Sequence, residues 1–256
     1  MRASPCGRIA FELFSGSGRF SSSWRAHERL GSVPIIPVDV KIHTSHDLNL
    51  DSNQRFIRGL IMANKVSALW VGTPCSSWSL ARAGGSGPPP LRGPQHVMGL
   101  PNLTPKDQWR VHVANRLMRF TASLLRVSHR MHIPICMENP HSSRIWKAAA
   151  VREAERLPST RSCTTDFCMW GTRWRKRTRL LACYLDVSRL AGQCPSVDGR
   201  CVRTGLKHQH LRGYGSRGFR TAAAEAYPAS FCQAAVEMYS YGIHGKFHRA
   251  LMRFID

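Results

Sequence analysis

The chain has 256 residues, of which 43% are hydrophobic, so it is long enough to bury a sizeable core and is not a disordered polypeptide. Its 37 lysines and arginines outnumber 15 acidic residues and give a formal charge of +22, which favours a nucleic acid as partner. No apolar run reaches the roughly 20 residues of a membrane span, and a strand-like segment follows the N-terminus too soon for a signal peptide. We therefore expect an intracellular monomer without a membrane partner, nuclear in a eukaryote and otherwise cytoplasmic.

The first third of the chain alternates apolar runs with helical patterns. Strands are expected over 8–14, 33–40 and 66–71, and helices over 20–31 and 52–65. The Gly- and Pro-rich residues 83–105 then form a long loop. Thr104 is placed to cap a helix that begins with Pro105 and reaches about Arg130.

The remaining elements follow the same alternation until the chain becomes irregular. Strands are expected at 133–140, near 164–170 and at 179–185, and helices at 142–156 and 222–240, the last interrupted near Pro228. This order predicts an α/β protein with a mostly parallel sheet and helices on both faces. We expect a core over 1–185, a small irregular basic lobe over 186–221, and a C-terminal helical segment over 222–256 that packs back on the core.

A glycine turn follows the first expected strand in FELFSGSG. Gly16 and Gly18 would let the backbone approach a ligand at the start of a helix, where an anionic group is favoured. Asp39, at the end of the next strand, is placed to bind ribose hydroxyls, and Asp47 an adenine amino group. Each aspartate taken alone could equally be a turn or cap residue. Together they indicate an adenosine cofactor, with NAD, ATP and S-adenosylmethionine all open.

Three further motifs each follow or precede an expected strand: Thr73-Pro74-Cys75, Glu138-Asn139-Pro140 and the basic run Arg175–Arg179. With the glycine turn, this ordered set resembles the cytosine carbon-5 methyltransferase family, in the reduced form found in phages and mobile elements. The resemblance implies a Rossmann-like class I fold that binds S-adenosyl-L-methionine and methylates DNA. It extends the cofactor site to four more residues: Phe14, Ser15, Leu48 and Pro74.

The resemblance also assigns the chemistry. Cys75 would add to carbon 6 of a flipped-out cytosine and activate carbon 5 toward the methyl donor. Glu138 would hold or protonate ring nitrogen 3, while Arg177 and Arg179 would grip the base oxygen and nearby backbone and favour the thiolate. Closure of loop 83–105 would exclude water. Alone, Cys75 would more simply be a buried structural cysteine.

Several positions depart from the family's pattern. Ser76 replaces a glutamine, Pro140 a valine and Arg175 another glutamine, and Ala226–Pro228 replaces the final Gly-Asn signature. The target-recognition region is reduced to roughly 186–220. These departures leave two alternatives: a methyltransferase acting on structured RNA such as tRNA, or a nucleic-acid-binding relic of a mobile element that has lost activity. An adenine amino-methyltransferase lacks support, because the Asn- or Asp-Pro-Pro-aromatic tetrapeptide is missing.

The basic lobe supplies the expected nucleic-acid surface. From Arg173 to Arg220 there are twelve basic residues, opposed only by Asp186 and Asp198. The mixture of basic residues, glycines and aromatics in 207–220 suits phosphate contacts with some base stacking. A flexible solvated loop could have the same composition. The expected contacts are Ser77, Arg82, Arg175, Lys207, Arg212, Arg217 and Arg220.

Cysteines and histidines also gather in the C-terminal part: Cys163, Cys168, Cys194, Cys201, His208 and His210. A structural zinc site would need four of them in tetrahedral reach. No Cys-x-x-Cys pair is present, so the sequence favours ordinary buried cysteines with solvated or phosphate-facing histidines, and no metal.

Overall fold

The computed structural model describes residues 7–80, 88–196, 198–211 and 224–244, together with 214–215, 218–219 and 221. Four of the expected nucleic-acid contacts lie outside the described residues: Arg82, Arg212, Arg217 and Arg220.

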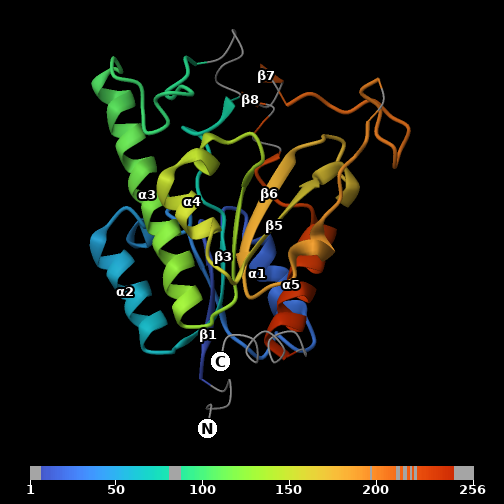
Figure 1. Cartoon of the computed structure of the whole chain (residues 1–256). Coiled ribbons are helices and arrows are strands. Elements are labelled where there is room, and N and C mark those ends of the chain that lie inside the picture. Colours follow the sequence, from blue (N-terminus) through green and yellow to red (C-terminus); the bar gives the residue numbers. More distant parts are fainter. Residues whose placement is uncertain are drawn as a thin grey trace.

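A six-stranded sheet with the order β2-β1-β3-β4-β6-β5 forms the centre of the molecule (Figure 1). The strands are β1 (Ile9–Leu13), β2 (Ile35–Val38), β3 (Val66–Val71), β4 (Ile135–Pro140), β5 (Thr160–Asp166) and β6 (Arg177–Cys183). β2, β1, β3 and β4 pair in parallel, whereas β6 runs antiparallel to both β4 and β5. The sheet is therefore mixed, and the prediction of a mostly parallel sheet is wrong. The reason is that the short connection from β5 to β6 holds no crossover helix, which a parallel pair would need.

Helices cover both faces of this sheet (Figure 1). α1 (Arg19–Ala26) and α5 (Ala229–His244) lie on one face, and α2 (Asp51–Met62), α3 (Pro105–Arg130) and α4 (Ala149–Glu155) on the other. β3 lies between the two layers, so all six of its residues are buried. Leu69 and Val71 pack toward α2–α4, while Trp70 packs toward α1 and α5. A central strand covered on both faces explains the continuous apolar run VSALWV.

Most element boundaries follow local sequence signals. Thr104 caps α3 by accepting a hydrogen bond from the Asp107 amide at 3.2 Å, and α3 has the predicted bounds. The helix expected over 142–156 is divided into a short η3 (Arg144–Lys147) and α4. β5 ends before Phe167, earlier than expected, and α5 begins only after Pro228. The other short elements are η1 (Thr44–His46), η4 (Phe167–Trp170), η5 (Val187–Leu190), β7 (Tyr214–Gly215) and β8 (Gly218–Phe219).

Within the described residues, none of the helices combines the length and the apolarity that a membrane crossing requires.

Candidate active site

The loop that carries Cys75 is fixed to the neighbouring strand. Asn139, fully buried at the end of β4, donates a hydrogen bond from Nδ2 to the Thr73 carbonyl oxygen at 2.7 Å. The Thr73 hydroxyl pairs with the Thr121 hydroxyl of α3 at 2.8 Å. Both contacts act on the residue two before Cys75, so the backbone entering the cysteine is held from the sheet and from a helix. The Thr-Pro-Cys and Glu-Asn-Pro motifs are thus parts of one site.

Glu138 precedes Asn139 and faces the opposite side of the sheet, toward α1 and α5. Its carboxylate is buried, and Oε2 accepts a hydrogen bond from the Tyr227 hydroxyl at 3.0 Å. Oε1 is also buried but has no hydrogen-bond partner within the described part of the chain. A buried carboxylate oxygen without a partner is costly, so it is a natural contact for a polar ligand.

Tyr227 lies in the candidate site, although no motif in the sequence predicts a functional role for it. It stands where the family's final signature is replaced, and its ring packs against Trp70 and Phe231 in the α5-facing core. Burial, with the charge of Glu138, raises the pKa of Tyr227 well above its ordinary value, so the phenol donates its proton to the carboxylate. A Cβ added at Gly72 would lie 2.7 Å from the Tyr227 hydroxyl oxygen, so a residue without a side chain lets this hydroxyl reach Glu138.

Cys75 is half-buried, and the charges of Lys176, Glu138 and, to a smaller extent, Glu225 affect the pKa of its thiol. Burial raises the pKa of its thiol, the positive charge of Lys176 lowers that pKa, and the negative charge of Glu138 raises it. The net effect is a raised pKa, so the Cys75 thiol stays protonated to a higher pH than an ordinary cysteine does. Cys75, Glu138 and Lys176 therefore belong to one electrostatic environment, and Lys176 is the group that favours the thiolate.

The arginines expected in this position are directed elsewhere. Arg177 binds the fully buried Asp166 through Nε and a second nitrogen at 2.8 and 2.9 Å. Arg179 pairs with Glu155 of α4 and lies over the Trp146 ring. Side chains alternate along β6, so both arginines lie on the α4 side, whereas Glu138 faces α1 and α5. The prediction that Arg177 and Arg179 grip the base is not supported by this placement.

Lys176, and not Arg177 or Arg179, is the basic residue whose charge acts on Cys75. Its ammonium donates to the Ala224 carbonyl oxygen at 3.1 Å and lies 5.2 Å from the Phe167 ring centre. These contacts fix the position of an ammonium whose positive charge lowers the pKa of the Cys75 thiol. The sequence contains a signal for this role of Lys176. It stands between Arg175 and Arg177, and alternate residues of an extended chain face opposite sides of a sheet.

The glycine turn after β1 has the conformation that a close ligand approach requires. Gly16 and Gly18 have φ values of +53° and +66°, and a Cβ at either position would meet nothing within 4 Å. Asp39 accepts a hydrogen bond from the Gly16 amide at 2.9 Å, which joins the turn to the end of β2. The Ser15 hydroxyl is buried and unpaired among the described residues. These features fit a polar ligand that lies close to the backbone of the turn.

The other expected cofactor residues surround the same end of the sheet. Phe14 is also in the left-handed region, with φ +58°, and its amide donates to the Val38 carbonyl. Asp47 is half-buried and accepts from the Asn49 amide at 2.8 Å. Leu48 is a buried core residue, and Pro74 is half-buried beside Cys75. Leu48 thus contributes mainly to packing.

Ser77 does not present its hydroxyl to solvent, so the prediction that it contacts nucleic acid is not supported. It is buried, and its oxygens accept hydrogen bonds from the buried guanidinium of Arg92 at 3.1 and 3.0 Å. Arg92 also stacks on Trp78, 3.3 Å from the ring centre, and donates to Asn115 of α3. Burial lowers the pKa of Arg92 to about 10. The described part of the 83–105 loop is therefore anchored on an arginine.

Two further basic residues of the expected surface are described. Lys207 is exposed, in agreement with a solvent-facing role, and its backbone pairs with Arg200. Arg175 is half-buried and donates to Asp166 at 3.1 Å. Arg175 therefore belongs at least in part to the Asp166 ion-pair network.

The cysteines and histidines of the C-terminal part separate into two groups. Cys168, Cys194, Cys201 and His208 place their ligand-type atoms within 4.8 Å of one another. Cys163 and His210 are not members of this cluster. The preference for dispersed buried cysteines is thus not supported by the geometry.

No family model matches the chain, and no curated protein does. Among solved structures, the chain is similar to that of the Entamoeba histolytica methyltransferase EhMeth, with 12% sequence identity and a TM-score of 0.38. The alignment covers 80% of this chain and 58% of that one, so the chain spans less than two thirds of that protein's length.

Proposed function

We propose that the chain is an S-adenosylmethionine-dependent methyltransferase that acts on carbon 5 of cytosine in DNA. The observation that supports this proposal is the Asn139–Thr73 hydrogen bond, which fixes the loop of Cys75 to the end of β4, directly after Glu138, whose buried Oε1 has no hydrogen-bond partner among the described residues. A thiol beside an acid that can bind a ring nitrogen is the pair that this reaction needs.

The protein groups act in sequence on the base. The Cys75 thiolate adds to carbon 6, and Glu138, which enters this step as the protonated acid, transfers its proton to nitrogen 3, so that an enamine nucleophilic at carbon 5 forms. After carbon 5 is methylated, its proton passes to a water molecule, the thiolate is expelled and the carbon 5–carbon 6 double bond returns, while nitrogen 3 gives its proton back to Glu138. Lys176 favours the thiolate before addition, and Tyr227 holds the Glu138 carboxylate in place.

S-adenosylmethionine would supply an electrophilic methyl group when bound. The buried Ser15 hydroxyl, the open left-handed turn at Gly16 and Gly18, and the acid at Asp39 are suited to hold its polar groups. These residues lie at the carboxyl ends of β1 and β2, beside the end of β3 that leads to Cys75.

The net charge of +22 supports a nucleic-acid substrate. Transfer of a tritiated methyl group to duplex DNA and to tRNA, measured side by side, tests the proposal. DNA labelling that is lost in Cys75→Ala but kept in Cys163→Ala, a matched half-buried cysteine of β5, would support it. Labelling of tRNA alone would move the substrate to RNA. Folded protein that labels neither would contradict the proposal.

A further inference from the structure

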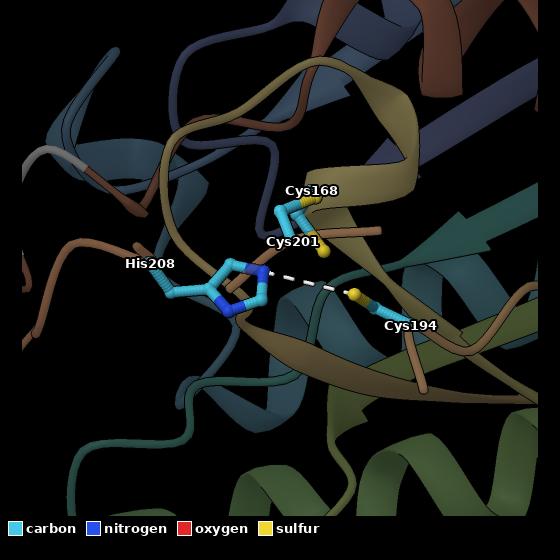
Figure 2. Close-up of side chains that lie close together, drawn as sticks. All are labelled: Cys168, Cys194, Cys201 and His208. Carbon is cyan, nitrogen blue, oxygen red and sulfur yellow. Dashed lines mark hydrogen bonds between the residues drawn. The ribbon is translucent and has the colours of Figure 1, made fainter. Parts of the chain in front are cut away.

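Four ligand-type side chains converge beside the end of β5 (Figure 2). Cys168 comes from η4, directly after β5, while Cys194, Cys201 and His208 come from the segment that follows η5. The three sulfur atoms and one imidazole nitrogen all lie within 4.8 Å of one another, and Cys194 Sγ is 3.8 Å from His208 Nε2. The three cysteines are buried and His208 is half-buried.

The spacing of these atoms fits a small tetrahedral ion. A zinc–sulfur bond of about 2.3 Å places two sulfurs on a tetrahedron about 3.8 Å apart, so separations of this order need little adjustment. All eight cysteines in the described part of the chain are free thiols. A tetrahedral set of cysteine and histidine ligands around one ion is typical of structural zinc sites.

The backbone is arranged to present the ligands. A bridge between Arg200 and Lys207 closes a hairpin, which brings Cys201 and His208 to the same end. The Cys201 amide donates to the Leu206 carbonyl at 2.8 Å, and Gly205 closes the turn with φ +69°. In the sequence, Cys194, Cys201 and His208 are evenly spaced, a regularity that differs from the Cys-x-x-Cys pair of many zinc sites.

The cluster is joined to the sheet through Asp166. The Cys194 amide donates to Asp166 Oδ2 at 2.8 Å, and the same buried carboxylate binds Arg177. Cys194 therefore has a fixed position relative to β5 and β6. Any ion bound by the four residues would connect the segment after η5 to the edge of the sheet.

The segment 191–211 has little apolar material with which to fold on its own. Val202 and Leu206 are both exposed, and the buried cysteines form a separate small cluster against Met169. Short segments without a hydrophobic core are held by disulfides or metals. A metal cross-link supplies what packing lacks here.

We propose that Cys168, Cys194, Cys201 and His208 bind one zinc ion in a closed, structural site that holds the basic segment 191–211 against the end of β5. The ligands would be three thiolates, whose protons pass to solvent on binding, and one neutral imidazole. Because the protein supplies four ligands, no coordination position is left for a substrate, and the ion has a structural role. This inference is independent of the methyl-transfer chemistry.

The metal content of the full chain tests the proposal. Protein purified without a metal-affinity tag should contain about one zinc per chain. Substitution Cys194→Ser should abolish this content, whereas Cys163→Ser, outside the cluster, should preserve it. His208→Cys, which keeps four ligands, should retain zinc and shows whether loss in Cys194→Ser reflects the ligand rather than misfolding.

Two measurements on the unmodified protein do not depend on any variant. Exchange of the ion for Co²⁺ should give the visible absorption of a tetrahedral cobalt–thiolate site. Chelation should speed tryptic cleavage after the exposed residues Arg200, Arg203 and Lys207, because their backbone is no longer held in place, and added zinc should restore resistance. Absence of zinc and of cobalt absorption after incubation with either metal would overturn the proposal, as would a mass spectrum that shows a disulfide between two of the three cysteines.

Discussion

Asn139 Nδ2 donates to the carbonyl oxygen of Thr73 at 2.7 Å, from a side chain that is fully buried. This hydrogen bond connects the end of β4 to the loop that carries Cys75. Glu138 and Asn139 are neighbours in a strand and therefore face opposite sides of the sheet. Glu138 faces α1 and α5, where it meets Tyr227, and Asn139 binds the loop that carries Cys75.

Asn139→Ala should reduce methyl transfer by about tenfold to a hundredfold, because Cys75 loses its support and the Thr73 carbonyl loses its partner. The variant should also lose about 1–3 kcal/mol of unfolding free energy, measured in urea. Asn115→Ala is the matched control, since Asn115 also makes side-chain hydrogen bonds but with Arg92 and Met98. Equal losses of transfer at matched stability in the two variants would rule out a positioning role for Asn139.

The reactivity of Cys75 should depend on pH in a defined direction. The thiolate is the form that reacts with iodoacetamide, and burial raises the pKa of Cys75. The rate of alkylation should therefore rise with pH, and the rise should occur at a higher pH than for a solvent-exposed cysteine. Lys176→Met removes the positive charge that lowers this pKa and should shift the alkylation profile to higher pH. Glu138→Gln removes a charge that raises it and should shift the profile downward.

Arg179→Met provides the control for that experiment. Arg179 lies on the α4 side of β6 and pairs with Glu155, so its loss should leave the alkylation profile of Cys75 unchanged. A shift in Arg179→Met as large as that in Lys176→Met would show that the assignment of these two cations to opposite faces is wrong.

Gly72 and Tyr227 should be coupled. Gly72→Ala places a methyl group 2.7 Å from the Tyr227 hydroxyl oxygen and should displace it from Glu138, while Tyr227→Phe removes the hydroxyl. Each single change should slow methyl transfer about tenfold, the value of one hydrogen bond to a charged group. The double variant should be no slower than either single one. Additive losses would contradict the contact.

Asp39 should control cofactor affinity. It accepts from the Gly16 amide and stands beside the open turn, so Asp39→Ala should weaken S-adenosylmethionine binding by at least about tenfold in calorimetry. Asp51→Ala, at an exposed acid paired with Arg116, should bind the cofactor normally. If the unmodified protein binds no S-adenosylmethionine, the chain is better described as a nucleic-acid-binding relic.

Local signals predicted much of the fold. The Thr104 cap and Pro105 set the start of α3, and the unbroken apolar run VSALWV gave the bounds of the central strand β3. The antiparallel placement of β6 was not predictable in this way, because it depends on how a short connection folds back.

The candidate site was predictable by residue type but not by orientation. The charge of Glu138 acts on the Cys75 thiol, but the face on which Arg177 lies depends on the register of β6 with β4 and β5. A shift of one residue exchanges Lys176 for Arg177. The burial of Ser77 depends on Arg92, in a loop without periodicity, and Cys168 reaches Cys194 only through the fold.

Covalent trapping on DNA containing 5-fluorocytosine tests the proposed chemistry most directly, because fluorine at carbon 5 blocks the proton loss that releases the enzyme. In the presence of S-adenosylmethionine, the protein should form a denaturant-resistant complex with this DNA, with the crosslink at Cys75 by mass spectrometry. Cys163→Ala should form the complex, and Cys75→Ala should not. Methyl transfer to ordinary DNA without any trapped complex, or a complex that persists in Cys75→Ala, would contradict Cys75 as the nucleophile.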